Sequence, residues 1–503
     1  MSSPALSPPP SAPTGPASNV LARSTLLALC ACVLVAQSMV AAINLLIPQL
    51  AASSLHPSST ELLWTVDAYV IVFAGLLIPA GALGDRRGRK GVLLAGLALF
   101  AAGAALSALA TSPALLIAGR GVSGAGAACV MPATMSILVQ LAGPEHRARA
   151  LASWTLAVGL GGLAGNVGGG AVGQFLSWRA LFWLMVPLAA LLAWTVTVTV
   201  PRTGRSPQGH PDPRGTLLLV AALVALLAGI IEGPAYGWTS PRILVLFAVG
   251  AALTGLFTWY ALRSEAALFD PRVFRSRRLR AAVLGTATGF FGLFSLFYAN
   301  SQYLQYVKGY GPAVTGLAIV PLTIGMALFP KVATRWQAAS GPRPAVATGL
   351  FLIGAGLVGA STAGAATPYA LYACWLLVIS AGTGLCMPAL TVGVVSSLPA
   401  HRAGLGSGLG TSAREIGAAL GVAVTGTVLA VHDADAHAAS FADAMSPALR
   451  TVGTVVLVAT VLVTVGYRTG SGRRGAPRRR AHVHRRAEPA GRADLQCGPA
   501  QRV

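Results

Sequence analysis

The stretch Gly81-Ala-Leu-Gly-Asp-Arg-Arg-Gly-Arg-Lys90 lies between two long apolar runs and holds one acid, four bases and three glycines in ten residues. A charged side chain inside hydrocarbon is costly, so these charges must lie at a membrane surface. The glycines allow two helix ends to approach closely, and Asp85 can meet the positive N-terminus of the following helix or a neighbouring base. We therefore expect a tight, charged loop that joins two membrane helices and whose bases mark the cytoplasmic face.

The composition of the whole chain indicates an integral membrane protein. Hydrophobic residues make up 54% of the 503 residues and charged residues only 10%, which is too apolar for a water-soluble globule. The net charge of +22 is compatible with either a nucleic acid or a membrane surface as partner, and the distribution of the bases decides between them. Because the bases follow the loops between apolar runs, we expect a lipid bilayer as partner and no nucleic acid.

Neither end of the chain has the pattern of a folded domain. Residues 1–22 are rich in Ser, Pro and Ala and predict a disordered cytoplasmic tail rather than a signal peptide. The arginine-rich segment 468–503 predicts a second such tail, attracted to anionic headgroups; an RNA or lipid site is the alternative, although no aromatic residue is interleaved for base stacking. The six cysteines have no C-x-x-C or Cys/His ligand spacing, so we expect no metal site.

A membrane-spanning helix needs about 20 apolar residues. Fourteen segments meet this requirement, at 23–47, 62–83, 91–110, 114–139, 150–173, 179–200, 215–234, 241–262, 280–304, 312–334, 344–363, 368–396, 405–430 and 446–467. If both tails are cytoplasmic, the only bases on external segments are Arg179, Arg242, Lys308 and Arg450. The excess of bases on the other side predicts that both termini are cytoplasmic.

An internal repeat organises these spans. At an offset of 256 residues the chain aligns with itself, matching Pro132 with Pro388 and Gly165 with Gly421 among other pairs. Both copies enter the membrane in the same sense, so we expect an all-α membrane fold with two six-helix bundles, related by a parallel repeat, around a central cavity. The predicted divisions are an N-terminal bundle at 23–200, a linker with two extra membrane helices at 201–262, and a C-terminal bundle at 263–467.

Asp67 is the main candidate for proton and substrate exchange, because an acid in a spanning helix is a functional candidate by default. It lies about six residues, or roughly 9 Å, below the external end of its predicted helix, and Arg120 lies at a matching depth in another span. Burial disfavours a charged acid and a nearby arginine favours it, so this competition can place proton release where a substrate cation triggers it. Trp64 and Tyr69 can hold a lipophilic cation against the carboxylate. A buried Asp67–Arg120 ion pair that only fixes two helices is the alternative.

Three further charges lie in or near the predicted spans. Arg414 and Glu415 stand some six to ten residues from the cytoplasmic end of the span at 405–430. They can gate the inner mouth or form a second carboxylate site; a pair that snorkels to the interface is the alternative. Glu232 lies beside an external loop, where we expect a solvated acid.

The span at 150–173 has a nearly smooth face. A neighbouring helix can pack and slide against such a face at close range, and simple packing is the alternative to a functional role. The glycines that form this face are Gly159, Gly161, Gly162, Gly165, Gly168, Gly169 and Gly170.

These features together resemble the fourteen-helix drug:proton antiporters of the major facilitator superfamily and, within it, the multidrug and quaternary-ammonium exporters of bacteria. The resemblance covers about residues 23–467. It rests on G-x-L-x-D-R-x-G-R-K at 81–90, on Trp64-x-x-Asp67-x-Tyr69, on Leu116-x-x-x-Arg120-x-x-x-Gly124-x-Gly126, and on the segments that begin at Trp178 and Tyr303.

The resemblance implies roles for individual residues. Asp67 would contribute to cation recognition, Arg120 would assist proton movement, and the loop would lock the inner gate through Gly81, Asp85, Arg86, Gly88, Arg89 and Lys90. The glycine-rich span is similar to the family's antiporter motif G-P-x-x-G-G at Gly162, Gly165, Asn166, Gly169 and Gly170, with Asn166 where the proline would stand.

The first span departs from the family pattern. The signature Leu-Asp-x-Thr-x-x-Asn ends on Asn44 here, but Met39 takes the place of the acid and Ala41 that of the threonine. One expected proton carrier is missing, so either proton coupling depends on fewer carboxylates or the substrate range differs.

We therefore expect a proton-driven exporter of amphipathic, cationic drugs or toxic organic compounds. It would work by alternating access as a monomer in a bacterial plasma membrane, with small molecules and protons as partners and without a cofactor. A carrier of one specific metabolite and a non-transporting membrane scaffold or sensor are the alternatives. No nucleotide-binding motif and no catalytic triad is found in the sequence, so we do not expect an enzyme.

Overall fold

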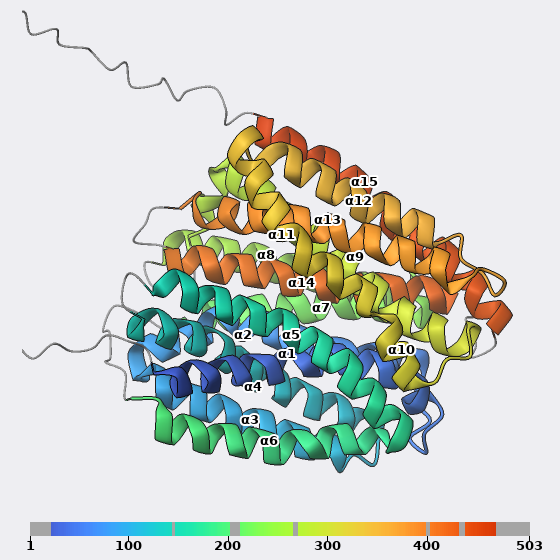
Figure 1. Cartoon of the computed structure of the whole chain (residues 1–503), viewed down its shortest axis with the longest axis horizontal. Coiled ribbons are helices and arrows are strands. Elements are labelled where there is room, and N and C mark those ends of the chain that lie inside the picture. The colour runs from blue at the N-terminus through green and yellow to red at the C-terminus, as the bar shows by residue number, and fades with distance from the viewer. Residues whose placement is uncertain are drawn as a thin grey trace, which may run out of the picture.

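The computed structural model describes residues 22–142, 146–201, 212–264, 270–398, 403–431 and 438–468, and within them every regular element is a helix. In this part of the chain, fourteen helical segments are long and apolar enough to cross a membrane, so the predicted all-α membrane fold is confirmed. The helices lie side by side along one common direction (Figure 1). The two predicted tails lie outside the described residues.

The first six helices form one bundle. Within it α1 packs against α5, α2 against α4, and α3 against both α4 and α6. The six helices are α1 (Arg23–Ala51), α2 (Ser59–Arg87), α3 (Arg89–Ala108), α4 (Pro113–Leu141), α5 (Arg147–Phe175) and α6 (Trp178–Thr199).

The last six spans form the second bundle. Two of its spans are composite: α9 continues into the π-helical turn η2, and α10 is followed by α11 after an interruption at Ile319. The elements are the short 3-10 helix η1 (Pro271–Arg275), α9 (Arg277–Gln302), η2 (Tyr303–Val307), α10 (Pro312–Ala318), α11 (Val320–Ser340), α12 (Pro342–Ala360), α13 (Tyr369–Val395), α14 (Ala403–Val431) and α15 (Ala438–Arg468).

The sequence repeat appears in three dimensions as two equivalent helix pairs. On α5, a Cβ added at Gly165 would overlap the carbonyl oxygen of Ser38 in α1. On α14, a Cβ added at the equivalent Gly421 would likewise overlap the carbonyl oxygen of Phe291 in α9. In both bundles, therefore, a glycine at the repeated position brings the fifth helix into backbone contact with the first.

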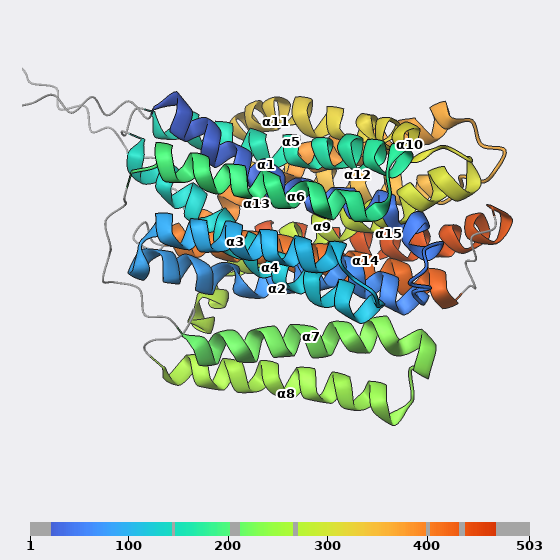
Figure 2. The ribbon, with the colours of Figure 1, turned by 90° about the horizontal axis from the view of Figure 1, so that it is seen from below.

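The two extra helices, α7 (Pro213–Tyr236) and α8 (Pro241–Arg263), form a hairpin beside the bundles, so they are central only in the sequence. Figure 2 shows the hairpin as a separate layer. Helix α7 touches both bundles: Val220 lies on Gly75 of α2, and the carbonyl of Ile230 accepts a 2.9 Å hydrogen bond from the Thr427 hydroxyl of α14. Helix α8 packs mainly on α7.

Side-chain caps mark the starts of several helices. Ser58 and Glu61 form a capping box at the start of α2. Ser112 caps α4 ahead of Pro113 at the first helical position, where the missing N–H is not needed. The caps fix the residues at which α2 and α4 begin, and both helices begin at the same end because α3 runs back between them, so the depths of Asp67 and Arg120 can be compared.

The loop expected at 81–90 is much shorter than predicted. Helix α2 continues through Arg87, and α3 begins at Arg89, so Gly88 alone connects them with φ of 101°. The prediction that α2 ends near residue 83 was wrong because charged residues can remain helical once a helix projects beyond the hydrocarbon. The connection between the spans predicted at 405–430 and 446–467 is also shorter, since α15 already begins at Ala438.

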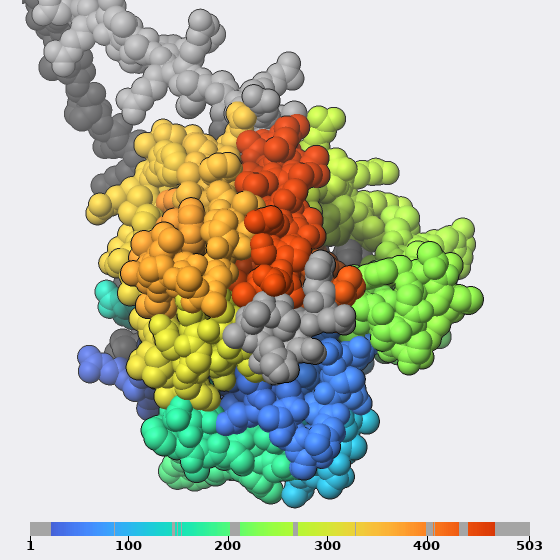
Figure 3. Space-filling model, turned by 90° about the vertical axis from the view of Figure 1, so that its right-hand side faces the viewer, coloured from blue at the N-terminus to red at the C-terminus, as the bar shows by residue number. Residues whose placement is uncertain are grey.

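We call the two ends of the molecule the basic end and the opposite end. The basic end carries bases of both bundles, namely Arg23, Arg86, Lys90, Arg277 and Arg343. The opposite end holds the C-terminus of α1 and the N-termini of α2 and α10. Figure 3 views the opposite end, where α10 of the second bundle meets the first bundle. There Pro312 of α10 lies directly on Gly170 and Gly173 of α5.

Candidate functional site

Arg120 of α4 is held against Tyr69 of α2. Gly124, one turn further along α4, touches the backbone carbonyl of Tyr69, and a Cβ at this position would overlap it. This close approach puts the Arg120 guanidinium carbon 4.6 Å from the centre of the Tyr69 ring, while its Nε donates a 2.9 Å hydrogen bond to the carbonyl of Thr65. Arg120 is fully buried, and its two terminal nitrogens have no acceptor among the described residues.

Asp67 is also fully buried, and neither of its carboxylate oxygens accepts a hydrogen bond from the described part of the chain. Because α2 begins at Ser59, Asp67 lies about 12 Å from the helix start, slightly deeper than expected, and Arg120 lies about 10 Å from the start of α4. The depths agree, but these two described residues form no ion pair. The structural ion pair considered as the alternative role is therefore absent.

Glu415 lies in the middle of α14 and not near the start of the helix at the basic end. It is the thirteenth residue of the helix, about 18 Å from Ala403, and 2% of its surface is exposed. Its Oε1 accepts a 2.8 Å hydrogen bond from Arg414 Nε and forms an ion pair with a terminal nitrogen of the same guanidinium at 2.6 Å. The roles expected for this pair, as an inner gate, a second carboxylate site or a pair that snorkels to the interface, stay predictions.

The acids of the two bundles lie across their boundary from tyrosines of the other bundle. Tyr69 of the first bundle lies within electrostatic range of Glu415, and Tyr298 of α9 lies within range of Asp67. Tyr69 also donates a 2.9 Å hydrogen bond to the carbonyl of Ala36 in α1. Helices α2 and α14 pack directly on each other, so charged groups of both bundles meet in one buried region.

Two other predicted site residues have different positions. Trp64 is half-buried and packs against the hydrophobic core of the first bundle. Asn44 is buried in α1, where its side-chain nitrogen donates a 3.2 Å hydrogen bond to the carbonyl of Val40. The backbone carbonyl of Asn44 accepts a hydrogen bond from Ser301 of α9, so Asn44 lies at the boundary between α1 and α9.

The bases of the predicted gate bind ends of neighbouring helices in their own bundle. A terminal nitrogen of Arg89 donates a 3.1 Å hydrogen bond to the carbonyl of Ser136 in α4. The amine of Lys90 donates to the carbonyls of Thr197 at 2.9 Å and Val200 at 2.5 Å, at the C-terminus of α6. A cation at the negative end of a helix is stabilising, so these two bases tie α3 to α4 and α6.

The other predicted gate residues make fewer contacts. Arg86 is exposed, and a Cβ at Gly81 would lie 3.6 Å from Pro132, an ordinary contact. Asp85 lies in α2, but its side chain falls outside the described part of the structure. Its predicted role in the gate stays a prediction.

The glycine-rich helix α5 faces two partners. Gly165 and Gly169 pack on α1, and Gly170 packs on Pro312 of α10 in the other bundle, whereas a Cβ at Gly162 would meet nothing within 4 Å. Asn166 is 1% exposed, and neither polar atom of its side chain has a partner among the described residues. The helix runs unbroken through Asn166, as expected where the family's proline is missing.

Glu232 is not a free solvated acid. Its carboxylate forms a 2.7 Å ion pair with Arg242 across the turn between α7 and α8. The same guanidinium stacks on Tyr236 with 3.9 Å to the ring centre. This cluster closes the hairpin and lies outside the buried region between the bundles.

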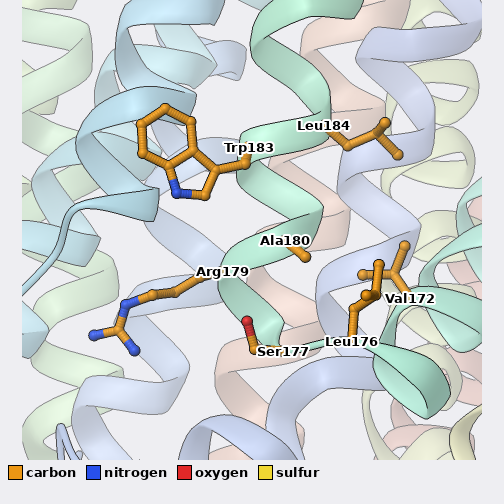
Figure 4. A pocket seen from close by; sticks show the side chains of 7 residues that line it. All are labelled: Val172, Leu176, Ser177, Arg179, Ala180, Trp183 and Leu184. Carbon is orange, nitrogen blue, oxygen red and sulfur yellow. The ribbon is translucent and has the colours of Figure 1, made fainter.

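A shallow groove of about 550 Å³ lies on α5 and α6 at the opposite end (Figure 4). Its lining is mostly apolar, and Arg179 and Trp183 project to one side of α6 while Val172 and Leu176 lie on the other side. Arg179 stacks on Trp178 and donates a 2.9 Å hydrogen bond to the carbonyl of Ala110. The arginine thus braces helix ends of the first bundle, and the groove is separate from the buried charges.

Sequence reasoning missed several polar residues of α9. Tyr298, Asn300, Ser301 and Gln302 are all buried at the end of the helix. Asn300 accepts a 2.8 Å hydrogen bond from the Tyr372 hydroxyl. The signal was the run Asn300-Ser301-Gln302 at the end of an apolar span, where three successive polar side chains need partners.

Comparison with known proteins agrees with this arrangement. A family model described as Major Facilitator Superfamily matches residues 29–422. The chain is 32% identical over 369 residues to the multidrug resistance protein Stp of Mycobacterium tuberculosis, covering 73% of this chain and 68% of that protein. It is 33% identical over 384 residues to the methylenomycin A resistance protein of Streptomyces coelicolor, covering 75% and 79%. It is 30% identical over 385 residues to the multidrug efflux pump LfrA of Mycolicibacterium smegmatis, covering 75% of each.

Solved structures share the fold at low sequence identity. A peptide transporter POT in complex with sulfate aligns with a TM-score of 0.64 at 15% identity, covering 88% of this chain and 94% of that one. A bacterial homologue of the human lysosomal transporter Spinster aligns with a TM-score of 0.61 at 16% identity, covering 88% and 95%. With its fourteen spans, its two repeated bundles and a family match over most of its length, this chain belongs to the major facilitator superfamily.

Proposed function

We propose that this protein is a proton-driven exporter of amphipathic, cationic organic compounds. The observation that carries the proposal is Asp67, a fully buried carboxyl group without a hydrogen-bond partner among the described residues. An unpaired charge in such a place is costly, and either a proton or a substrate cation offsets the cost. Exchange of one for the other at Asp67 is the simplest chemistry that this group can perform.

The arrangement around Asp67 supports alternating access. Arg120 and Tyr69 lie on the first bundle and Glu415 on the second, so a relative movement of the bundles changes the electrostatic surroundings of both acids. We assign Glu415 as a second titrating acid, which compensates for Met39 in the place of the family's helix-1 acid. The names of the relatives, which are multidrug and antibiotic resistance proteins, favour export over uptake.

The proposed orientation follows from the charges. The basic end faces the cytoplasm by the positive-inside rule, so both termini are cytoplasmic and the opposite end faces outward. The protein would act as a monomer in a bacterial plasma membrane, and the proton gradient would drive transport without a cofactor.

Ethidium efflux from everted membrane vesicles tests the function. Vesicles containing the protein should accumulate ethidium when a proton gradient is imposed and lose this activity when a protonophore is added. Asp67→Asn should reduce accumulation to the level of vesicles without the protein, whereas Glu232→Gln, which removes the paired acid of the α7–α8 turn, should leave it intact. Undiminished uphill transport by Asp67→Asn would remove Asp67 from the mechanism. Transport of one metabolite, with no response to any cation, would favour the specific carrier.

A further inference from the structure

A proline leaves one backbone carbonyl of α1 without its helical donor. Pro48 lies inside α1 near the opposite end, and it has no N–H to bond the carbonyl of Asn44, four residues earlier. A free carbonyl in the membrane core is costly unless a neighbouring group supplies a donor. The donor here comes from the other bundle.

Ser301 of α9 supplies the missing donor. Its hydroxyl is fully buried and donates a 2.6 Å hydrogen bond to the carbonyl of Asn44. The next carbonyl of α1, that of Leu45, accepts a 3.0 Å hydrogen bond from the side-chain nitrogen of Gln305. Ser301 and Gln305 are four residues apart, so they project from one face of the helix onto two successive carbonyls.

The π-helical turn sets the position of Gln305. Helix α9 changes at Tyr303 into η2, which covers residues Tyr303–Val307. π-Helical turns are rare and frequently mark functional sites. The turn carries Gln305 at the end of α9, where it faces α1 of the other bundle.

Both hydrogen bonds lie where the two bundles meet at the opposite end, beside the contact of Pro312 with Gly170 and Gly173. Ser301 lies about one helical turn from Tyr298, the α9 residue within electrostatic range of Asp67, and Gln305 about two turns. A movement that separates the bundles at this end must break both bonds. The Asn44 carbonyl would then lose the donor that replaces its missing helical one, and the Leu45 carbonyl would lose Gln305.

We propose that Ser301 and Gln305 form a latch that holds the opposite end closed by binding two successive α1 carbonyls, one of which Pro48 leaves without its helical donor. Both are positioning residues: they set the balance between the closed and open states and do not touch the transported compound. The latch is a property of the two-bundle fold, so it does not depend on which compound is carried or on proton coupling.

Distances between spin labels at the opposite end test the latch. Labels at Leu109, which follows α3, and at exposed Ala366, between α12 and α13, report the separation of the bundles in a cysteine-free background reconstituted in nanodiscs. Ser301→Ala should raise the ratio of long-distance to short-distance states about fivefold, because a buried acceptor loses its donor. Ser301→Thr, which keeps the hydroxyl, should resemble the wild type.

Ser295→Ala is the matched control. Ser295 is a buried serine of the same helix, but its hydroxyl donates to Phe291 and Gly421 within the second bundle, at 2.7 and 3.0 Å. Its substitution should leave the distance distribution unchanged. An equal shift for Ser295→Ala and Ser301→Ala, or no shift for Ser301→Ala, overturns the proposal.

Pro48→Ala provides an independent arm. It supplies an N–H for the Asn44 carbonyl, so Ser301→Ala should have a smaller effect in the Pro48→Ala background than in the wild type. If Ser301→Ala does not yield folded protein, Gln305→Met tests the second bond by the same distances, and an unchanged distribution for it counts against the latch. Because the readout is a distance, a failed transport assay would refute the proposed function and leave the latch standing.

Discussion

Arg120 turns its guanidinium toward the ring of Tyr69, 4.6 Å from the ring centre, and not toward the carboxylate of Asp67. Asp67 on α2 and Arg120 on α4 lie at about the same depth, yet the two buried charged groups do not form an ion pair. Under the proposed function, this separation would allow Asp67 to exchange a proton for a substrate cation. It also makes the planar shape of the arginine, and not its charge alone, important for the site.

Arg120→Lys should therefore impair transport although it keeps the positive charge. A lysine cannot stack its ammonium group as a plane on Tyr69 while donating to Thr65, and a desolvated cation–π contact contributes about 2 kcal/mol. We expect the initial rate of ethidium accumulation in vesicles to fall about tenfold or more. Tyr69→Phe keeps the ring and should lose less activity. Wild-type rates for Arg120→Lys would show that charge alone is sufficient.

Gly124→Ala should disturb the same contact from the other side. The added Cβ would overlap the carbonyl of Tyr69 and push α4 away from α2, which costs about 1–3 kcal/mol. Gly121→Ala is the matched control, because its Cβ would lie 3.8 Å from Val72, an ordinary contact on the same helix. We expect a lower melting temperature in detergent and slower efflux for Gly124→Ala alone. Equal melting temperatures for the two variants would contradict the close approach.

Gly88→Ala should destabilise the connection between α2 and α3. No heavy atom lies within 4 Å of a Cβ at this position, so space is not limiting, but φ of 101° is strained for any residue with a side chain. The expected loss is about 1–2 kcal/mol. Gly91→Ala serves as control, since it is helical with equally open surroundings. The free energy of unfolding, followed by helix content in denaturant, should fall for Gly88→Ala and stay level for Gly91→Ala.

Glu415→Gln, alone and together with Arg414→Gln, should separate a structural role of the Arg414–Glu415 pair from a titrating role of Glu415 in transport. Removing the acid leaves the mostly buried guanidinium without its counter-charge, which costs about 3–5 kcal/mol for a buried pair, so the yield of monodisperse protein should fall. The double variant Arg414→Gln with Glu415→Gln removes both charges and should recover the yield. Efflux should remain lost in the double variant if Glu415 titrates during transport. Recovery of both yield and efflux would reduce the pair to a structural element.

The number of spans and the two-bundle architecture were predictable because they depend on properties that are local in the sequence. Apolar runs of sufficient length must span, and the repeat of Gly165 at Gly421 places the same backbone contact in each half. The ends of the helices were less predictable. Charged residues at the membrane surface can be helical or form a loop. The sequence does not show that the chain stays helical through Arg87 and turns only at Gly88, where φ is 101°.

The candidate site was predictable in depth but not in its contacts. Counting residues from the helix starts placed Asp67 and Arg120 at one level, because the rise per residue is fixed. Which way Arg120 turns depends on the approach of Gly124 to Tyr69, a distance between helices that no local pattern encodes. The Ser301–Asn44 hydrogen bond was partly predictable. Pro48 in the sequence indicates that the Asn44 carbonyl lacks its helical donor, but it does not indicate which residue supplies another donor.

The α7–α8 hairpin has a consequence for compounds dissolved in the lipid. A carrier of two bundles has two lateral seams, one between α2 and α14 and one between α5 and the α10–α11 span. Because α7 touches α2 through Val220 and α14 through Ile230, the hairpin covers the first seam along its length. Under the proposed export function, an apolar compound dissolved in the lipid would therefore reach the boundary between the bundles beside α5, at the seam that the hairpin leaves uncovered.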